Sequence, residues 1–292
     1  NVSRHEEILD QARARAMEGV DTIADVSQAQ SRLARARSTL TEARASLRNG
    51  EEMYMRLTNH SAMNLAPVTM PGDMFASSEA VLKAAQKSNP KVAAYLEDIK
   101  AATAAKEQVN SAYSPSLSLE AGPSYSDRDG KSEMWTAEFG VAAVVRWNLF
   151  NSGADVAESK AAAARIRQSR RVLYDYMDDL KLNVEESWTE FLSAQKQLEF
   201  YREAIEYNKT TREAYEEQFV MGERSLLDVL DAENELFNSS TQAATALGNT
   251  LIAAYRMKAL AGQLLPCLGI STDMLKTTPA DHEPLDQLTM PE

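Results

Sequence analysis

"GERSLLDVLDAENEL" (Gly222–Leu236) repeats an earlier stretch of the same chain, "GVDTIADVSQAQSRL" (Gly19–Leu33). The offset between the two copies is 203 residues, 222 minus 19. A repeat at a fixed offset predicts an internal duplication of one structural unit. The identical pairs are Gly19/Gly222, Asp25/Asp228, Val26/Val229, Ala29/Ala232 and Leu33/Leu236, and the near matches are Thr22/Ser225, Ile23/Leu226 and Gln30/Glu233.

The second copy has the residues of a sharp turn between two helices. Gly222 suits the left-handed position that follows a helix, and Ser225 suits the N-cap of the next helix. Asp228, three residues after Ser225, occupies the place of a capping-box acid. The stretch therefore predicts the tip of an antiparallel helical hairpin, and the first copy predicts a second tip. The match extends to "YMRLTNH" (54–60) and "MKALAGQ" (257–263).

Long helices flank the second tip. No Gly or Pro stands between Gly153 and Gly222, and apolar residues recur there at gaps of three and four. This spacing predicts a continuous helix over 154–221 and a returning helix over 225–264. Ahead of them, the sequence predicts a linker over 61–77 and a helix over 78–112, with Asn89–Pro90 as the place where that helix would bend.

The composition excludes several functional classes. A net charge of −12 argues against nucleic acid as a partner, because binding it needs a basic face. The single Cys267 cannot form an intrachain disulfide, and His5, His60 and His282 lack the spacing of metal ligands. No nucleophile motif is present. We therefore expect no catalytic residue, no metal and no cofactor.

Residues 114–150 predict a β-hairpin whose second strand is about 15 residues long, well above the usual five or six. Apolar and polar residues alternate along both strands, as they also would in a soluble sandwich. Trp135 and Trp147 lie on the same apolar face, roughly 30 Å apart for tilted strands, which suits two membrane interfaces. We expect a lipid face of Leu117, Leu119, Tyr125, Trp135, Phe139, Val141, Val145 and Trp147, and a lumen face of Glu120, Glu138 and Arg146. The aromatic residues expected at the membrane interfaces, at the ends of the lipid face, are Tyr125, Trp135 and Trp147.

The order of these pieces resembles the outer-membrane efflux protein family, the TolC-like family. Nearly the whole chain takes part in the resemblance, to about Ile270. The segments that carry it are "EGVDTIADVSQAQSRL", "YSPSLSLEAGPSYS", "WNLFNSGADVAESKAA" and "MGERSLLDVLDAENEL". The ending "YRMKALAGQLLPCLGI" resembles the branch that serves type I protein secretion.

The resemblance implies a mainly α fold in which transmembrane strands contribute to a trimeric duct, a β-barrel continued by an α-barrel. It further implies a homotrimer in the outer membrane of a Gram-negative bacterium that extends into the periplasm. The duct would be a passive conduit for proteins or drugs. A periplasmic adaptor would open it, in concert with an inner-membrane pump of the ABC or RND type.

The family pattern also implies a division of this chain. Residues 1–60 would be the end of a first repeat, 61–77 a linker, 78–265 a second repeat, and 266–292 a periplasmic tail. If the repeats are alike, roughly 125 residues that match the second repeat would precede Asn1. We therefore expect the chain to be a fragment that lacks the first helix, strand hairpin and long helix.

The tips provide the candidate site residues. By resemblance, Asp25, Arg224, Asp228 and Asp231 lie at the closed periplasmic entrance, with Arg224 paired to Asp25 of the other hairpin. Phe219 stands where relatives often have a tyrosine, so a gate bond from that hydroxyl is absent. Most charges at hairpin tips are simply solvated, and Asp25 and Asp228 also suit helix capping. The residues expected to dock the adaptor are Gly19, Val20, Thr22, Gly222, Glu223 and Ser225.

A second interpretation stays open at this stage. A soluble periplasmic coiled-coil protein, structural or an adaptor, would also contain a long helical hairpin. Adaptors of that kind carry the hairpin once, inside a lipoyl-like domain rich in glycine turns, and no such domain is visible here. The apolar strand face flanked by tryptophans is the feature that favours the duct.

Overall fold

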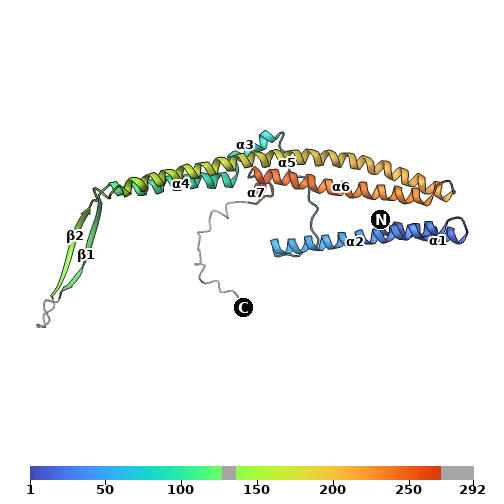
Figure 1. Ribbon diagram of the computed structural model, residues 1–292, viewed down its shortest axis with the longest axis horizontal. Coiled ribbons are helices and arrows are strands. Elements are labelled where there is room, and N and C mark those ends of the chain that lie inside the picture. The colour runs from blue at the N-terminus through green and yellow to red at the C-terminus, as the bar shows by residue number, and fades with distance from the viewer. Residues whose placement is uncertain (127–135, 271–292) are drawn as a thin grey trace. The chain divides into compact units, whose positions relative to one another are not determined.

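The computed structural model describes residues 1–126 and 136–270, and no side chain is described at 124–126 or 136–138. Helices dominate the described chain (Figure 1). In chain order the elements are α1 (Val2–Met17), α2 (Ile23–Thr58), α3 (Ser78–Ser88), α4 (Pro90–Asn110), the 3₁₀ turn η1 (Ser111–Tyr113), β1 (Ser116–Ser126), β2 (Thr136–Arg146), α5 (Ala154–Val220), α6 (Leu226–Leu260) and α7 (Leu264–Cys267).

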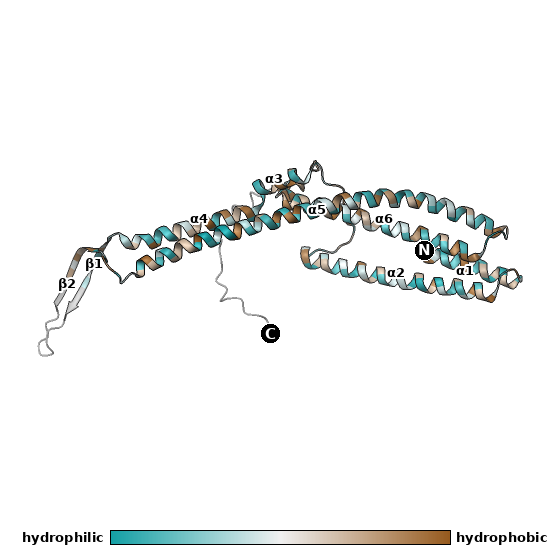
Figure 2. Cartoon of the chain, turned by 45° about the horizontal axis from the view of Figure 1, so that its top comes forward, coloured by the Kyte–Doolittle hydropathy of each residue, from teal (hydrophilic) through white to brown (hydrophobic). Residues whose placement is uncertain are grey.

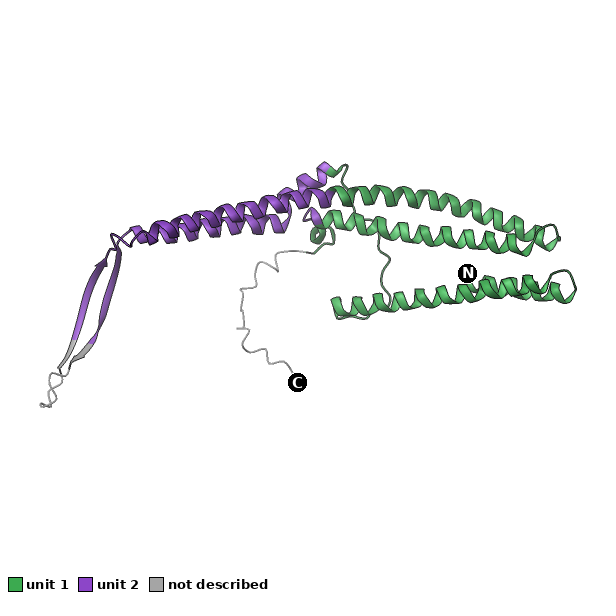
Figure 3. Ribbon diagram, in the orientation of Figure 1, with its two compact units in different colours: residues 1–78, 185–259, 264–292 green, residues 79–184, 260–263 purple. Residues whose placement is uncertain are grey.

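The chain divides into two compact units, which Figure 3 colours separately. Unit 1 contains residues 1–78 and 185–259 together with the segment that begins at residue 264. Unit 2 contains residues 79–184 and 260–263. The predicted division into two sequence repeats cuts the chain differently and stays a prediction.

Unit 1 consists of two helical hairpins whose helix ends coincide at the offset of the sequence repeat. Helix α1 ends at Met17 and α2 begins at Ile23, while α5 ends at Val220 and α6 begins at Leu226. Both pairs of positions differ by 203 residues. Polar and apolar residues alternate along these helices with a helical period (Figure 2), so each helix buries one stripe.

An apolar cluster lies beneath the two tips and packs both hairpins of unit 1 together. Helices α1 and α2 contribute apolar side chains to it, and so do the end of α5 and the start of α6. Burial of this apolar surface stabilises the contact by roughly 25 cal/mol for each Å² removed from water. The buried members are Ile8, Leu9, Ala12, Ala29, Leu33, Phe219, Leu226, Val229 and Leu230.

The helix predicted over 78–112 is two helices in unit 2. The chain breaks at Asn89, whose side-chain oxygen accepts from the backbone N–H of Lys91 and caps α4, while Pro90 takes the first helical position. The Asn89 amide also donates to the carbonyl of Leu260 at 2.8 Å. Residue 89 therefore ends one helix, starts the next and holds the end of α6.

The returning helix, predicted over 225–264, ends at Leu260. Gly262 follows with a φ of +68°, which interrupts the helix before the short α7. The long helix predicted over 154–221 is α5, Ala154–Val220. At 1.5 Å per residue, its 67 residues correspond to roughly 100 Å of helix. No described helix combines the length and the apolar character needed to cross a membrane.

In the β-hairpin of unit 2, β1 and β2 pair in antiparallel register as a two-stranded sheet. Leu117 lies opposite Val145, and Glu120 lies opposite Ala142. Directly opposed residues share a face, so the register separates the expected apolar set from the expected polar set. The second strand ends at Arg146, short of the end of the hairpin predicted over 114–150.

Candidate functional site: the paired helical tips

The first tip closes with two backbone hydrogen bonds after α1. The N–H of Gly19 donates to the carbonyl of Ala16 at 3.2 Å, and the N–H of Val20 donates to the carbonyl of Arg15 at 2.9 Å. Gly19 has a φ of +76°. This pattern is a Schellman motif, in which a left-handed residue lets the last helical carbonyls find donors.

The second tip reproduces the same motif after α5. The N–H of Gly222 donates to the carbonyl of Phe219 at 3.0 Å, and the N–H of Glu223 donates to the carbonyl of Gln218 at 2.8 Å. Gly222 has a φ of +78°. The duplicated sequence therefore gives a duplicated Schellman turn.

The helices that leave the tips begin with equivalent caps. The backbone N–H of Asp25 donates to the hydroxyl oxygen of Thr22, and the Asp25 carboxylate accepts from the Thr22 N–H at 2.9 Å. Ser225 and Asp228 make the same reciprocal pair at the start of α6. Hydrogen bonds from the Thr22 hydroxyl and backbone lower the pKa of the Asp25 carboxyl. Both aspartates thus have a capping role.

The side chains that close each tip differ in charge. In the first tip, the Nε of Arg15 lies 3.1 Å from the Asp21 carboxylate. In the second, the Nε of Arg224 donates to the side-chain oxygen of Gln218 at 2.8 Å, and its guanidinium stacks 4.2 Å from the Tyr215 ring centroid. At the offset of 203, Arg15 corresponds to Gln218 and Asp21 corresponds to Arg224. The arginine therefore precedes the turn in the first tip and follows it in the second.

Arg15 also joins the two tips. Its Nη1 donates to the carbonyl of Phe219 at 3.1 Å, and its guanidinium lies 4.3 Å from the centroid of the Phe219 ring. Arg32 of α2 makes a second link, an ion pair of 2.8 Å with Asp231 of α6. Sequence reasoning missed both arginines. The sequence signal that could have identified Arg15 is the difference in charge between equivalent positions of the two copies, Arg15 against Gln218 and Asp21 against Arg224.

The four residues expected at the gate lie at these tips, but the expected pair between Arg224 and Asp25 is not formed within the chain. Arg224 bonds to Gln218 and lies 4.0 Å from the Asp228 carboxylate of its own tip. The Asp25 carboxylate accepts from Thr22 instead. The Asp25 carboxylate already accepts hydrogen bonds within its own cap, so it does not depend on a distant arginine for a partner. Whether these residues act as a gate stays a prediction.

The residues expected to dock a partner lie on surfaces that carry exposed apolar side chains. Val20 is 61% exposed in the first tip, between Met17 at 88% and Ile23 at 86%. Val220 and Met221 are 69% and 65% exposed in the second tip. Exposed apolar residues gathered in this way often mark an interaction surface.

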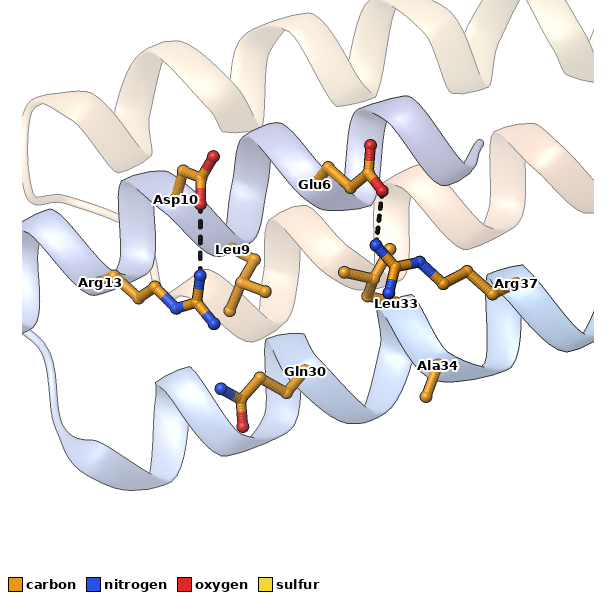
Figure 4. A pocket seen from close by; sticks show the side chains of 8 residues that line it. All are labelled: Glu6, Leu9, Asp10, Arg13, Gln30, Leu33, Ala34 and Arg37. Atoms are coloured by element: carbon orange, nitrogen blue, oxygen red, sulfur yellow. Dashed lines mark hydrogen bonds and ion pairs between the residues drawn. The ribbon is translucent and has the colours of Figure 1, made fainter.

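A groove of about 480 Å³ runs between α1 and α2, close to the first tip (Figure 4). Buried Leu9 and Leu33 provide an apolar floor. An ion pair of 2.7 Å between Arg37 and Glu6 crosses it from helix to helix. The remaining lining residues are Asp10, Arg13, Gln30 and Ala34.

The β-hairpin is a second candidate surface. Leu119, Phe139 and Val141 are 75%, 74% and 63% exposed, and they lie on one face by the strand register. On the other face, Arg146 lies 4.0 Å from Glu120.

Three aromatic residues were expected at the ends of this apolar face. Trp147 follows β2, and its indole N–H donates to the carbonyl of Tyr113 at 3.1 Å. Trp135 lies outside the described residues. Tyr125 is placed only by its backbone, opposite Ala137.

A family model described as "Outer membrane efflux protein" matches residues 81–263, more than half of the chain. The chain belongs to the outer membrane efflux protein family. The matched range contains the β-hairpin and the second tip, whereas the first tip precedes residue 81.

Two related proteins match most of the chain. Outer membrane efflux protein BepC of Brucella suis is 24% identical over 97% of the chain and 61% of its own length. Outer membrane protein TolC of Vibrio cholerae is 24% identical over 88% of the chain and 60% of its own length. The chain thus spans about three fifths of these relatives.

Solved structures of an outer membrane protein and of an outer membrane channel share the fold. VceC of Vibrio cholerae has a TM-score of 0.72 and 15% identity, covering 89% of this chain and 63% of its own. CmeC of Campylobacter jejuni has a TM-score of 0.71 and 15% identity, covering 90% of this chain and 57% of its own.

Proposed function

We propose that the chain is part of an outer-membrane exit duct of a tripartite export system, for type I protein secretion or multidrug efflux. The duct is a homotrimer and a passive conduit, without catalytic residues. It extends into the periplasm, where an adaptor opens it in concert with an inner-membrane pump of the ABC or RND type. Membership in the outer membrane efflux protein family supports this proposal.

The apolar face of the β-hairpin is the observation that carries the proposal. Among the residues that the structure describes, the outer edge of each strand has no partner, and one face of the sheet also exposes leucine, valine and phenylalanine. Lipid would cover the apolar face, and strands of neighbouring protomers would pair with the edges. A trimer meets both needs at once.

Paired arginine substitutions test the placement of this face in lipid. Val141→Arg on the apolar face should cost about 2–4 kcal/mol near the middle of a bilayer, whereas Ala142→Arg on the opposite face should cost much less. The measurement is the yield of full-length trimer in the outer-membrane fraction. Equal losses from the two substitutions, or recovery of the unmodified protein in the soluble periplasm, would favour the soluble coiled-coil interpretation.

The two tips are the proposed docking site for the adaptor. Gly19, Val20 and Thr22 of one tip, with Gly222, Glu223 and Ser225 of the other, form duplicated turns beside exposed apolar residues. A photo-crosslinker placed at Glu223 should capture the adaptor in cells. Capture of outer-membrane neighbours alone would overturn the tip assignment.

The proposed gate uses charges that recur three times around the axis of a trimer. Asp228 and Asp231 lie three residues apart on α6, so both carboxylates share a face. Arg224 and Arg32 offset them within each protomer. Arg224→Ser should raise single-channel conductance of the full-length trimer, and the pair Asp228→Asn with Asp231→Asn should lower cation selectivity. Unchanged conductance in intact Arg224→Ser trimers would make Arg224 a tip charge without a gating role.

A further inference from the structure

A buried cluster of ionisable groups lies in unit 1 between α1 and the α5–α6 hairpin. Glu233 of α6 is 6% exposed and His5 of α1 is 5% exposed. Neither residue belongs to the tips or to the expected gate. Buried charges are costly unless they are paired and hydrogen-bonded, so their presence in this seam needs an explanation.

The pairing of Glu233 is incomplete. Its nearest cation is Arg212 of α5, whose Nη1 lies 4.0 Å from Oε2, too far for a hydrogen bond. Arg4 of α1 is engaged elsewhere, because it pairs with Glu216 of α5 and with Glu7 at 2.7 Å. Within the described chain, the buried Oε2 of Glu233 and the Nε atoms of Arg4 and Arg212 have no hydrogen-bond partner.

The cluster joins elements that belong to different hairpins. The ion pair between Arg4 and Glu216 connects α1 to α5, and Arg212 connects α5 to Glu233 of α6. Besides the contact of Arg15 with Phe219, the contact of α1 with the second hairpin includes an apolar cluster toward the tip and this under-bonded ionic cluster farther along. The second part is sensitive to the charge on Glu233.

The ionised form of Glu233 is disfavoured in this environment. Burial raises the pKa of its carboxyl, and the negative charge of Glu216 acts in the same direction. Arg212 and Arg4 oppose this shift without cancelling it. A carboxyl whose pKa is raised by packing binds a proton more tightly when packed than when released to water.

We propose that Glu233 makes the packing of α1 against α5 and α6 depend on pH, so that acid tightens this seam and neutral conditions loosen it. The stabilisation is complete below the ordinary glutamate pKa of 4.5 and is lost as the pH rises through the raised value. The proposal concerns packing within the chain and holds whether or not the protein exports anything.

His5 acts with the opposite sign and has to be separated from Glu233. Burial lowers the pKa of its imidazole, and the positive charge of Arg32 lowers it further. Protonation of His5 therefore weakens the packed state as the pH falls below the ordinary value of 6.5. A His5→Gln background removes this contribution.

Distance measurements between spin labels test the proposal in the full-length protein. Labels at Gln11→Cys on α1 and Tyr207→Cys on α5 report on the seam, in a background where the exposed Cys267 is serine. Dilution with excess unlabelled protein restricts the distances to one protomer. With His5→Gln, the fraction of separated helices should fall between pH 7.5 and pH 5.0, by up to about tenfold for each unit by which the pKa of Glu233 is raised.

Matched variants decide the outcome. Glu233→Gln should abolish the pH response, and so should Glu233→Met if the amide variant does not fold. Glu235→Gln, an exposed residue on the same helix, should leave the response intact. The proposal is overturned if the response survives in folded Glu233 variants, if Glu235→Gln removes it, or if acid increases the separated fraction.

Discussion

The two copies of the helical hairpin share their backbone and differ in their side-chain partners. The turns at Gly19 and Gly222 have the same two backbone bonds, the same sign of φ and the same capping box. The arginine that closes the turn, in contrast, precedes it in the first copy, as Arg15, and follows it in the second, as Arg224. Local sequence therefore determines the turn, and the surroundings of each copy determine the charges.

The far ends of the two copies show the same contrast. Asn59 follows α2 with a φ of +56°, and its equivalent at the offset of 203, Gly262, has a φ of +68°. Asn59 is exposed. A Cβ on Gly262 would come within 2.1 Å of the carbonyl oxygen of Ser88. Both positions adopt the left-handed conformation, but only position 262 has no room for a side chain.

The largest effect is expected from Gly262→Asn, which places the residue of one copy in the other. Overpacking against the Ser88 backbone adds to the cost of a left-handed side chain, and together they should destabilise the protein by roughly 2–5 kcal/mol. Chemical denaturation in detergent, followed by circular dichroism, measures the loss.

The reciprocal change, Asn59→Gly, is the control for this comparison. Glycine adopts a positive φ without steric cost, so the folded state loses little, and only its greater freedom in the unfolded chain counts against it. The change should be within about 1 kcal/mol. Equal losses at positions 59 and 262 would show that conformation, rather than crowding at Ser88, explains the glycine.

Arg15→Gln, which places the residue of the second tip in the first, should have the second-largest effect. It removes the hydrogen bond to the Phe219 carbonyl and the contact with the Phe219 ring. A loss of about 1–2 kcal/mol is expected for a partly exposed charged hydrogen bond and a cation–π contact. Hydrogen exchange at the start of α6 is the measurement. Gln218→Arg is the counterpart, and a larger effect from it than from Arg15→Gln would contradict the assignment of Arg15 as the link.

The two caps should be equivalent, so Thr22→Ala and Ser225→Ala should each cost about 1 kcal/mol. At the first tip the loss should depend on pH, because the cap lowers the pKa of Asp25. A lowered carboxyl pKa gives stability that is present above the ordinary value of 3.8 and is lost as the pH falls through the lowered value. The difference between Thr22→Ala and the unmodified protein, measured by urea denaturation, should therefore shrink in acid. A constant difference from neutral pH down to pH 2 would contradict this.

Sequence alone could predict the features that depend on a few neighbouring residues. The end of α5 beside Gly222 and the start of α6 after Ser225 follow from glycine and capping chemistry. The predicted end of α6 at residue 264 lies beyond the observed end at Leu260, although Gly262 gives the same glycine signal as Gly222. The alternation of the strands likewise gave the two faces that the register of β1 and β2 supports.

Contacts between residues far apart in the chain could not be predicted in the same way. Arg15 meets Phe219 across 204 residues, and Asn89 meets Leu260 across 171. No periodicity specifies which exposed arginine of one helix reaches a carboxylate or carbonyl of another. Within the chain, Arg224 and Asp25 each have a nearer partner in their own tip, so the expected pair is not formed there, and the gating role of both residues stays a prediction.

The smallest effect is expected for the ion pair between Arg32 and Asp231, which joins the hairpins without a counterpart in the sequence repeat. The atoms are 2.8 Å apart, but the two side chains are 25% and 56% exposed, so water screens the attraction. A double-mutant cycle with Arg32→Gln and Asp231→Asn should give a coupling of about 0.2–1 kcal/mol. Raising the salt concentration should reduce it, since exposed charges are screened. The pair Arg37 with Glu6, also exposed but within the first hairpin, is the matched cycle. A coupling above about 2 kcal/mol, or one that salt leaves unchanged, would mean that Asp231 is desolvated in the assembled protein. The hairpins would then be joined by this charge pair as strongly as by Arg15.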